Sequence, residues 1–121
     1  MISDLLNNNL SVSLFLAIVC GLFVSIGVHE FAHAVTAYIL GDVTPYNQGR
    51  ITLNPLKHMD PLGSLFLVLV GFGWGRPVNI DSTNFKHPKL YTALTSIAGA
   101  FVQCLACICV FFNFYSFLFF N

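Results

Sequence analysis

The sequence is dominated by one apolar run, residues 10 to 40, that contains a cluster of ionisable side chains. No proline interrupts this run, and Gly41 follows it, as a glycine commonly follows the end of a helix. We therefore predict one long helix. Its first part, residues 10 to 28, is close to the length of about 20 residues that a bilayer crossing needs. Ionisable groups beside such a segment are costly, so they indicate a functional site.

The ionisable cluster is His29-Glu30-Phe31-Ala32-His33. Side chains four positions apart lie on the same face of a helix, so His29 and His33 can bind one Zn²⁺ ion together. Glu30 is offset around the helix axis, where a carboxylate can act as general base on water. The pattern predicts one zinc ion per chain, with His29 and His33 as ligands and Glu30 as the catalytic residue. The alternative is a chance pattern with purely structural histidines.

Composition indicates a membrane protein. Hydrophobic residues make up 56% of the 121 residues and charged residues only 8%, whereas a soluble domain carries about 25% charged residues. Ten charged side chains cannot cover a water-soluble globule of this size. The formal net charge is zero, which argues against nucleic acid as a partner. We predict a single membrane-embedded domain over residues 1–121, in contact with the lipid bilayer.

The remaining chain predicts a mainly α membrane fold, a bundle of about three transmembrane or re-entrant helices. Residues 62 to 74 are apolar but short, which favours a re-entrant segment, whereas the apolar block 90 to 120 is long enough for a full span. Within that block, the small residues Ala98-Gly99-Ala100 offer a close-packing surface, and Gln103 is expected to form a hydrogen bond inside the bundle.

A short membrane-associated β-strand or hairpin is expected after the first helix, at Arg50, Ile51, Thr52 and Leu53. These residues alternate between polar and apolar and include β-branched side chains. The spacing of His29, Glu30 and His33 is typical of a metalloprotease helix. A strand edge beside such a site can pair with an extended substrate backbone, so the four residues are candidates for substrate binding. An ordinary interfacial hairpin explains the pattern equally well.

The identity of a third zinc ligand is less constrained. Catalytic zinc usually has three protein ligands, and Glu30 is the only glutamate in the chain. The best internal candidates lie in the loop His58-Met59-Asp60, and we favour Asp60 for its reach and charge. The alternative is that Asp60, which precedes a proline, only starts a turn.

The chain resembles the site-2 protease family of intramembrane zinc metalloproteases (peptidase family M50), in particular its short bacterial and archaeal branch. The resemblance runs from about Val28 to Gln103 and rests on HEFAHAVTAYILGDVTPYNQGRITLNPLKHMDPLGSL followed by GWGRPVN. It implies zinc bound by His29 and His33, Glu30 as base, and a multi-pass protein of the prokaryotic cytoplasmic membrane. The implied substrate is a transmembrane protein or peptide, cleaved in or near its membrane-spanning segment.

The sequence departs from this family in two places. The family's aspartate ligand lies in a later Pro-Leu-Asp-Gly type motif that these 121 residues do not contain, and the family's Ala-Gly-Pro-x-x-Asn signature reads Ala98-Gly99-Ala100-Phe101-Val102-Gln103. We therefore expect the C-terminal part of the family core to be missing, with a second polypeptide as a source of the aspartate. The alternative functions are an inactive or split homologue that acts as a membrane scaffold, and a small metal carrier or channel.

Overall fold

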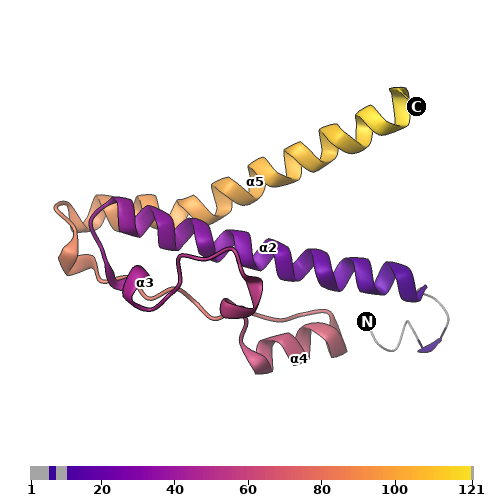
Figure 1. The fold of residues 1–121 in the computed structure, drawn as a ribbon, viewed down its shortest axis with the longest axis horizontal. Coiled ribbons are helices and arrows are strands. Elements are labelled where there is room, and N and C mark those ends of the chain that lie inside the picture. Colours follow the sequence, from indigo (N-terminus) through magenta and orange to yellow (C-terminus); the bar gives the residue numbers. More distant parts are fainter. Residues whose placement is uncertain (1–5, 8–10, 121) are drawn as a thin grey trace.

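Two long helices, α2 (Val12–Ile39) and α5 (Pro88–Phe120), form the body of the protein, and the segment between them lies along one flank of α2 (Figure 1). The structure is a computed structural model that describes residues 6–7 and 11–120. It confirms the prediction of a mainly helical fold. The short elements between the long helices are α3 (Thr44–Asn47), the 3-10 helix η1 (Pro55–Lys57), α4 (Pro61–Val70) and the 3-10 helix η2 (Ser82–Asn84).

The helix α2 is the long helix predicted from the apolar run. It begins after Ser11, whose side-chain oxygen accepts a hydrogen bond from the Leu14 N–H at 3.3 Å. It ends at Ile39 with Leu40 as its C-cap, and Gly41 follows with a φ of 108°, a left-handed conformation that favours glycine. Leu10, at the start of the predicted run, lies outside the described residues. His29, Glu30 and His33, which we call the metal motif, thus all lie within one unbroken helix.

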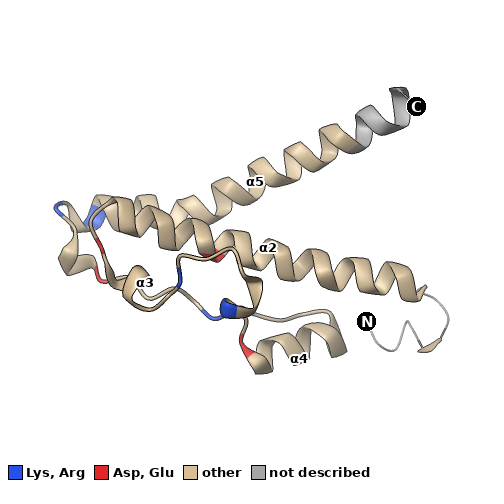
Figure 2. Cartoon of the chain, viewed as in Figure 1, with Lys and Arg blue, Asp and Glu red and all other residues tan. Residues whose placement is uncertain are grey.

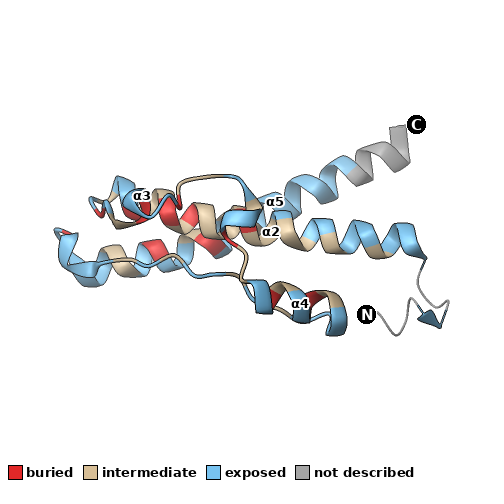
Figure 3. Cartoon of the chain, turned by 60° about the horizontal axis from the view of Figure 1, so that its bottom comes forward, coloured by how far each residue is buried: buried red, intermediate tan, exposed pale blue. Residues whose placement is uncertain are grey.

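Both long helices are long enough and apolar enough to cross a membrane. In their most apolar windows only 17% of the α2 residues and 11% of the α5 residues are buried, whereas the core helix of a soluble protein would be mostly buried. Figure 3 shows buried residues where the two long helices approach each other, and further ones in the connecting segment and on α4. The Lys, Arg, Asp and Glu residues of the described chain lie in the connecting segment and at the start of α5, apart from Glu30 on α2 (Figure 2).

The chain reverses direction after the short apolar helix α4. Asp60 caps its start by accepting a hydrogen bond from the Gly63 N–H at 2.9 Å, and Gly71 ends it with a φ of 89°. The chain then returns along α4 as an extended stretch, residues 71–81, which we call the return segment (Figure 1). Close backbone approach requires glycine here, because a Cβ on Gly63 would lie 2.2 Å from the Trp74 carbonyl oxygen.

The predicted β-strand at residues 50–53 is wrong. These residues have no regular secondary structure, and the described residues contain only one isolated antiparallel bridge, between Met59 and Gly75. Their backbone groups bond locally instead: the Arg50 N–H donates to the Pro45 carbonyl at 2.9 Å, and the Thr52 carbonyl accepts from the His58 ring at 2.8 Å. An alternating pattern cannot form a strand where no neighbouring segment is free to pair with it.

Asp42 joins the end of α2 to the segment that leads into α5. Its fully buried carboxylate accepts hydrogen bonds from the Thr44 hydroxyl at 2.6 Å, the Asp81 N–H at 2.8 Å and the Asn84 amide at 2.8 Å. Burial pushes the pKa of Asp42 upward, but the hydrogen bonds from Thr44, Asn84 and Asp81 outweigh it and hold this pKa below its ordinary value. The charged form therefore stabilises the fold.

We expect Asp42→Ala to lower the free energy of unfolding by about 2–3 kcal/mol, because it leaves buried donors without an acceptor. The contribution is fully present above the ordinary aspartate pKa of about 3.9 and is lost as the pH falls through the lower folded value. Thermal or denaturant unfolding in detergent measures both effects. The matched control is Asp81→Ala, whose exposed carboxylate bonds only to Thr83. Equal destabilisation by the two variants would contradict the prediction.

Candidate metal centre

The two motif histidines lie side by side on α2. Their Nε2 atoms are 3.1 Å apart, and their ring centroids are separated by 4.7 Å with the ring planes 80° apart. Two nitrogens bound to one tetrahedral Zn²⁺ at about 2.0–2.1 Å would be about 3.3 Å apart. The structure therefore confirms that His29 and His33 project together, with a spacing that suits two ligands of one ion.

The backbone of α5 holds His33 in a ligand-ready form. The Nδ1 atom of His33 lies 2.6 Å from the carbonyl oxygen of Thr95, which is fully buried. A carbonyl only accepts hydrogen bonds, so Nδ1 carries the ring proton and the Nε2 lone pair faces His29. Histidine ligands of metals usually donate their other ring N–H to a carbonyl or carboxylate in this way.

Gly99 allows α5 to approach the imidazole pair. A Cβ at this position would lie 2.4 Å from Nε2 of His33 and 2.8 Å from Cε1 of His29. Both distances are shorter than any real Cβ contact, so a side chain here would displace the rings. The predicted close-packing surface at Ala98-Gly99-Ala100 thus lies against the metal motif itself.

The side chain of Glu30 extends from α2 to the return segment. Its Oε2 accepts a hydrogen bond from the Val78 N–H at 3.3 Å, and the side chain borders two small cavities. One, of about 230 Å³, also borders His29, Gly73 and Gln103, and the other, of about 320 Å³, also borders His33 and Ile80. Glu30 therefore borders two open cavities, each large enough to hold water.

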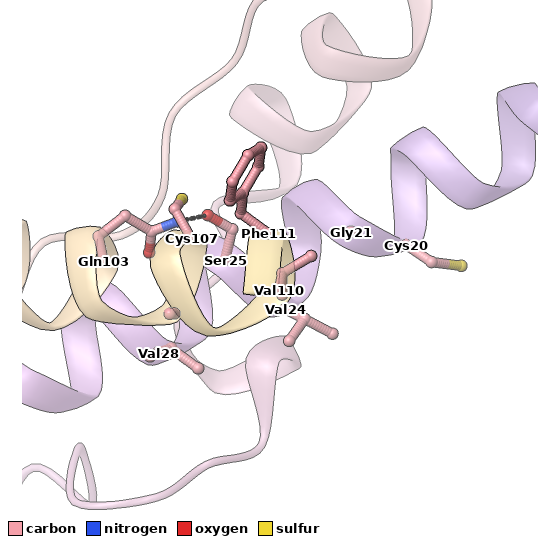
Figure 4. Close-up of a pocket in the computed structure, with 10 residues that line it drawn as sticks. Cys20, Gly21, Val24, Ser25, Val28, Gln103, Cys107, Val110 and Phe111 are labelled. Carbon is pink, nitrogen blue, oxygen red and sulfur yellow. Dashed lines mark hydrogen bonds between the residues drawn. The ribbon is translucent and has the colours of Figure 1, made fainter. Parts of the chain in front are cut away.

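Gln103 of α5 forms the hydrogen bond within the bundle that the sequence predicts. Its amide nitrogen donates to the Ser25 hydroxyl, and its buried Oε1 has no partner among the described residues. Beyond this bond α2 and α5 diverge, and an apolar cavity of about 720 Å³ opens between them, partly lined by Cys20, Val24 and Val110 (Figure 4). The Ser25–Gln103 pair separates this cavity from the smaller one beside His29.

The structure does not bring Asp60 to the histidine pair. Its carboxylate caps the start of α4. This is the turn-starting role that was the alternative to zinc ligation in the sequence. His58 is fully buried and its Nε2 bonds to the Thr52 carbonyl. Across the described residues, no three His, Cys, Asp or Glu side chains are placed to hold one metal ion together. Within the described part of the chain, the paired motif histidines therefore have no third such side chain beside them.

The candidate substrate residues Arg50, Ile51, Thr52 and Leu53 do not line either cavity beside Glu30. The return segment contributes Trp74, Val78 and Ile80 there instead. The Thr95 carbonyl and the Val78 N–H could not be predicted from the sequence, because both are backbone groups that no residue type identifies. The glycine-rich stretch around Gly73 was the available signal for a segment that packs closely on a neighbour.

The chain is similar to three curated proteins named as zinc metalloproteases. It is 49% identical over 87 residues to "Putative zinc metalloprotease YwhC" of Bacillus subtilis, covering 72% of this chain and 40% of that protein. It is 37% identical over 94 residues to "Putative zinc metalloprotease Rip2" of Mycobacterium tuberculosis (74% and 36%) and 43% identical over 56 residues to the protein of the same name from Mycolicibacterium smegmatis (46% and 22%).

The chain thus spans less than half the length of the curated relatives it matches. No protein-family model matches it, and no solved structure is similar to it. The names of these relatives agree with the zinc chemistry that the histidine pair suits.

We expect Gly99→Ala to weaken zinc binding roughly 10- to 100-fold, the range seen when the surroundings of metal ligands are disturbed. The added methyl group would push the two imidazoles apart. Competition with a chromogenic chelator measures the affinity. The control is Gly21→Ala, also in the long helices, where a Cβ meets nothing within 4 Å. Unchanged zinc affinity in Gly99→Ala would show that the pair does not depend on this contact.

Proposed function

We propose that this chain forms the zinc-binding part of an intramembrane metalloendopeptidase of the site-2 protease type, which hydrolyses peptide bonds in or near transmembrane segments. The observation that carries the proposal is the pairing of the His29 and His33 Nε2 atoms at 3.1 Å, next to Glu30 on an apolar helix long enough to cross a membrane. The zinc metalloprotease names of the relatives support the same chemistry.

In this proposal His29 and His33 hold the zinc ion, which supplies the Lewis acidity that polarises a peptide carbonyl and acidifies water. Glu30 takes a proton from water and delivers it to the leaving amine. The Val78 N–H bonded to Glu30 orients the carboxylate. Thr95 holds the His33 ring proton throughout, so that the same ring nitrogen always faces the ion.

The proposed substrate is a transmembrane protein or peptide, which would reach the site from the bilayer. A helix in lipid must unwind locally before a peptide bond is accessible, because its carbonyls are already hydrogen-bonded. The apolar cavity between α2 and α5 adjoins the Ser25–Gln103 pair and offers a lipid-facing approach. The extended return segment, whose Val78 N–H already reaches Glu30, lies closer to the proposed chemistry than residues 50–53 and is the better candidate to receive an unwound backbone.

The third zinc ligand is proposed to come from outside these 121 residues, either from further chain or from a second polypeptide. The support is that the described residues group only two ligands, while the matched relatives are more than twice as long as the aligned part. The same observation favours a second candidate function, a membrane scaffold that keeps the fold without turnover. Zinc content in the presence of the further chain or second polypeptide separates the two, since a scaffold with two ligands would still hold the ion weakly.

The proposal predicts different outcomes for two variants of the motif. Glu30→Gln should retain zinc and lose cleavage of a membrane-inserted reporter helix by roughly 100-fold or more, because it removes only the base. His33→Ala should lose both zinc and cleavage. Metal analysis of the purified protein and gel detection of the cleaved reporter are the measurements.

His87→Ala is the matched control, because His87 lies before α5 and its ring packs on Tyr91, away from the motif. It should keep both zinc and cleavage. Full proteolysis by Glu30→Gln would refute the assignment of the base. Sub-stoichiometric zinc in the unaltered protein, with no reporter cleavage, would favour the scaffold.

A further inference from the structure

A basic cavity lies in the connecting segment, apart from the metal centre. Its volume is about 700 Å³, and it lies between the loop that follows α3 and the return segment. We propose that this cavity, which we call the basic pocket, binds the phosphate group of an anionic membrane lipid. Its lining residues are Gln48, Gly49, Arg50, Leu56, Lys57, Met59, Arg76, Pro77 and Asn79.

The basic pocket concentrates positive charge without compensation. It contains Arg50, Lys57 and Arg76, three of the five Lys and Arg residues of the chain, and no acidic residue lines it. The acidic side chain nearest in sequence, Asp60, is turned to the start of α4. No ion pair forms among Arg50, Lys57, Arg76 and the carboxylates of the described residues. Like charges held together in this way favour an anion between them.

Arg50 gives the pocket a fixed, buried cation. Its side chain is only 8% exposed, and its guanidinium donates a hydrogen bond to the Lys57 carbonyl. That bond fixes the position of the group but does not neutralise it. A buried charge without a counter-charge is costly, and a bound anion would remove that cost. Guanidinium groups suit phosphate in particular, because their planar donors match pairs of phosphate oxygens.

In a bilayer crossed by residues 12–28 of α2, the pocket would lie at the level of the lipid phosphates. The two segments that form the pocket pass α2 at the end of the uncharged part of that helix. In one of them Pro55, next to Leu56 of the pocket, would lie 3.1 Å from a Cβ on Gly27. In the other Val78, next to Pro77 of the pocket, donates its N–H to Glu30. From this level α2 extends back to Val12 through about 25 Å without an Asp, Glu, Lys, Arg or His. That distance is close to the thickness of the hydrocarbon core, about 30 Å.

The helix α4 supports the same placement. It starts at Pro61, two residues after Met59 of the pocket wall, and runs beside α2 toward the N-terminal end of that helix (Figure 1). It carries no charged residue and exposes large apolar side chains, among them Leu62, Leu65 and Leu69. The basic pocket is therefore at the mouth of an apolar re-entrant segment, where anionic headgroups attract basic side chains.

Native mass spectrometry of the full chain in neutral detergent tests the proposal with two lipids, phosphatidylglycerol and phosphatidylcholine. We expect preferential retention of phosphatidylglycerol, and a loss of roughly 20-fold in its affinity in the double variant Lys57→Gln/Arg76→Gln. Both side chains are exposed, and the hydrogen bonds of these residues use backbone atoms, so the fold should survive. The unfolding midpoint without lipid verifies that it does.

The matched control is Lys86→Gln/Lys89→Gln, which removes the same charge from the loop before α5 and from the first turn of that helix. It should leave phosphatidylglycerol retention unchanged. An equal loss in both double variants would overturn the proposal and indicate general charge attraction instead. Unchanged retention in Lys57→Gln/Arg76→Gln would also overturn it, because the lipid would then not depend on these charges. A third arm adds inorganic phosphate: displacement of the lipid would assign the site to soluble phosphate, and persistence of the lipid adduct would assign it to the headgroup. Zinc binding does not enter any arm, so the result is independent of the protease proposal.

Discussion

The contact between α2 and α5 is the interaction on which the fold and the site both depend. Helices in lipid gain little from burying apolar surface against each other, so close packing of small residues and interhelical hydrogen bonds must hold them together. Here Gly99 brings the backbone of α5 onto the imidazole pair, the Thr95 carbonyl binds His33, and Gln103 binds Ser25. Two of these three contacts, those of Gly99 and Thr95, also position the candidate zinc ligands.

The connecting segment completes the site from the other side. The return segment depends on glycines for its close approach, since a Cβ on Gly73 would lie 2.3 Å from the Gly63 carbonyl oxygen and one on Gly75 would lie 2.7 Å from Ile26. Asp42 anchors the far end of this segment through the Asp81 N–H. With both ends held, Val78 is positioned beside Glu30. A loop without these constraints could not present a backbone donor to one carboxylate on α2.

The described part of the chain combines a long uncharged stretch of helix with a group of unpaired cations. The uncharged part of α2 ends at the metal motif, and three cations gather at that level without acidic partners. Polar and ionisable groups at membrane depth are costly unless they line a cavity or find partners. The cavities beside Glu30 and the basic pocket meet that requirement in different ways, with space for water in one case and for a bound anion in the other.

The long first helix, the apolar final block and the shared face of His29 and His33 could all be predicted from the order of the residues. These follow from local periodicity: the 3.6-residue repeat of a helix makes the i, i+4 pair adjacent wherever the helix forms. The dipeptide Asp60-Pro61 also indicated that Asp60 could start a turn and not bind zinc, which agrees with its capping of α4. The strand at residues 50–53 failed because strand formation needs a partner, which a local pattern does not supply.

The groups that surround the motif depend on how distant segments pack together. The Thr95 carbonyl, the Gly99 backbone and the Val78 N–H come from segments 45 or more residues away, and they act through main-chain atoms that every residue shares. The basic pocket likewise joins residues from two loops whose charges are scattered along the chain. Neighbours along a helix are set by its geometry, whereas neighbours across a fold are set by packing of the whole chain.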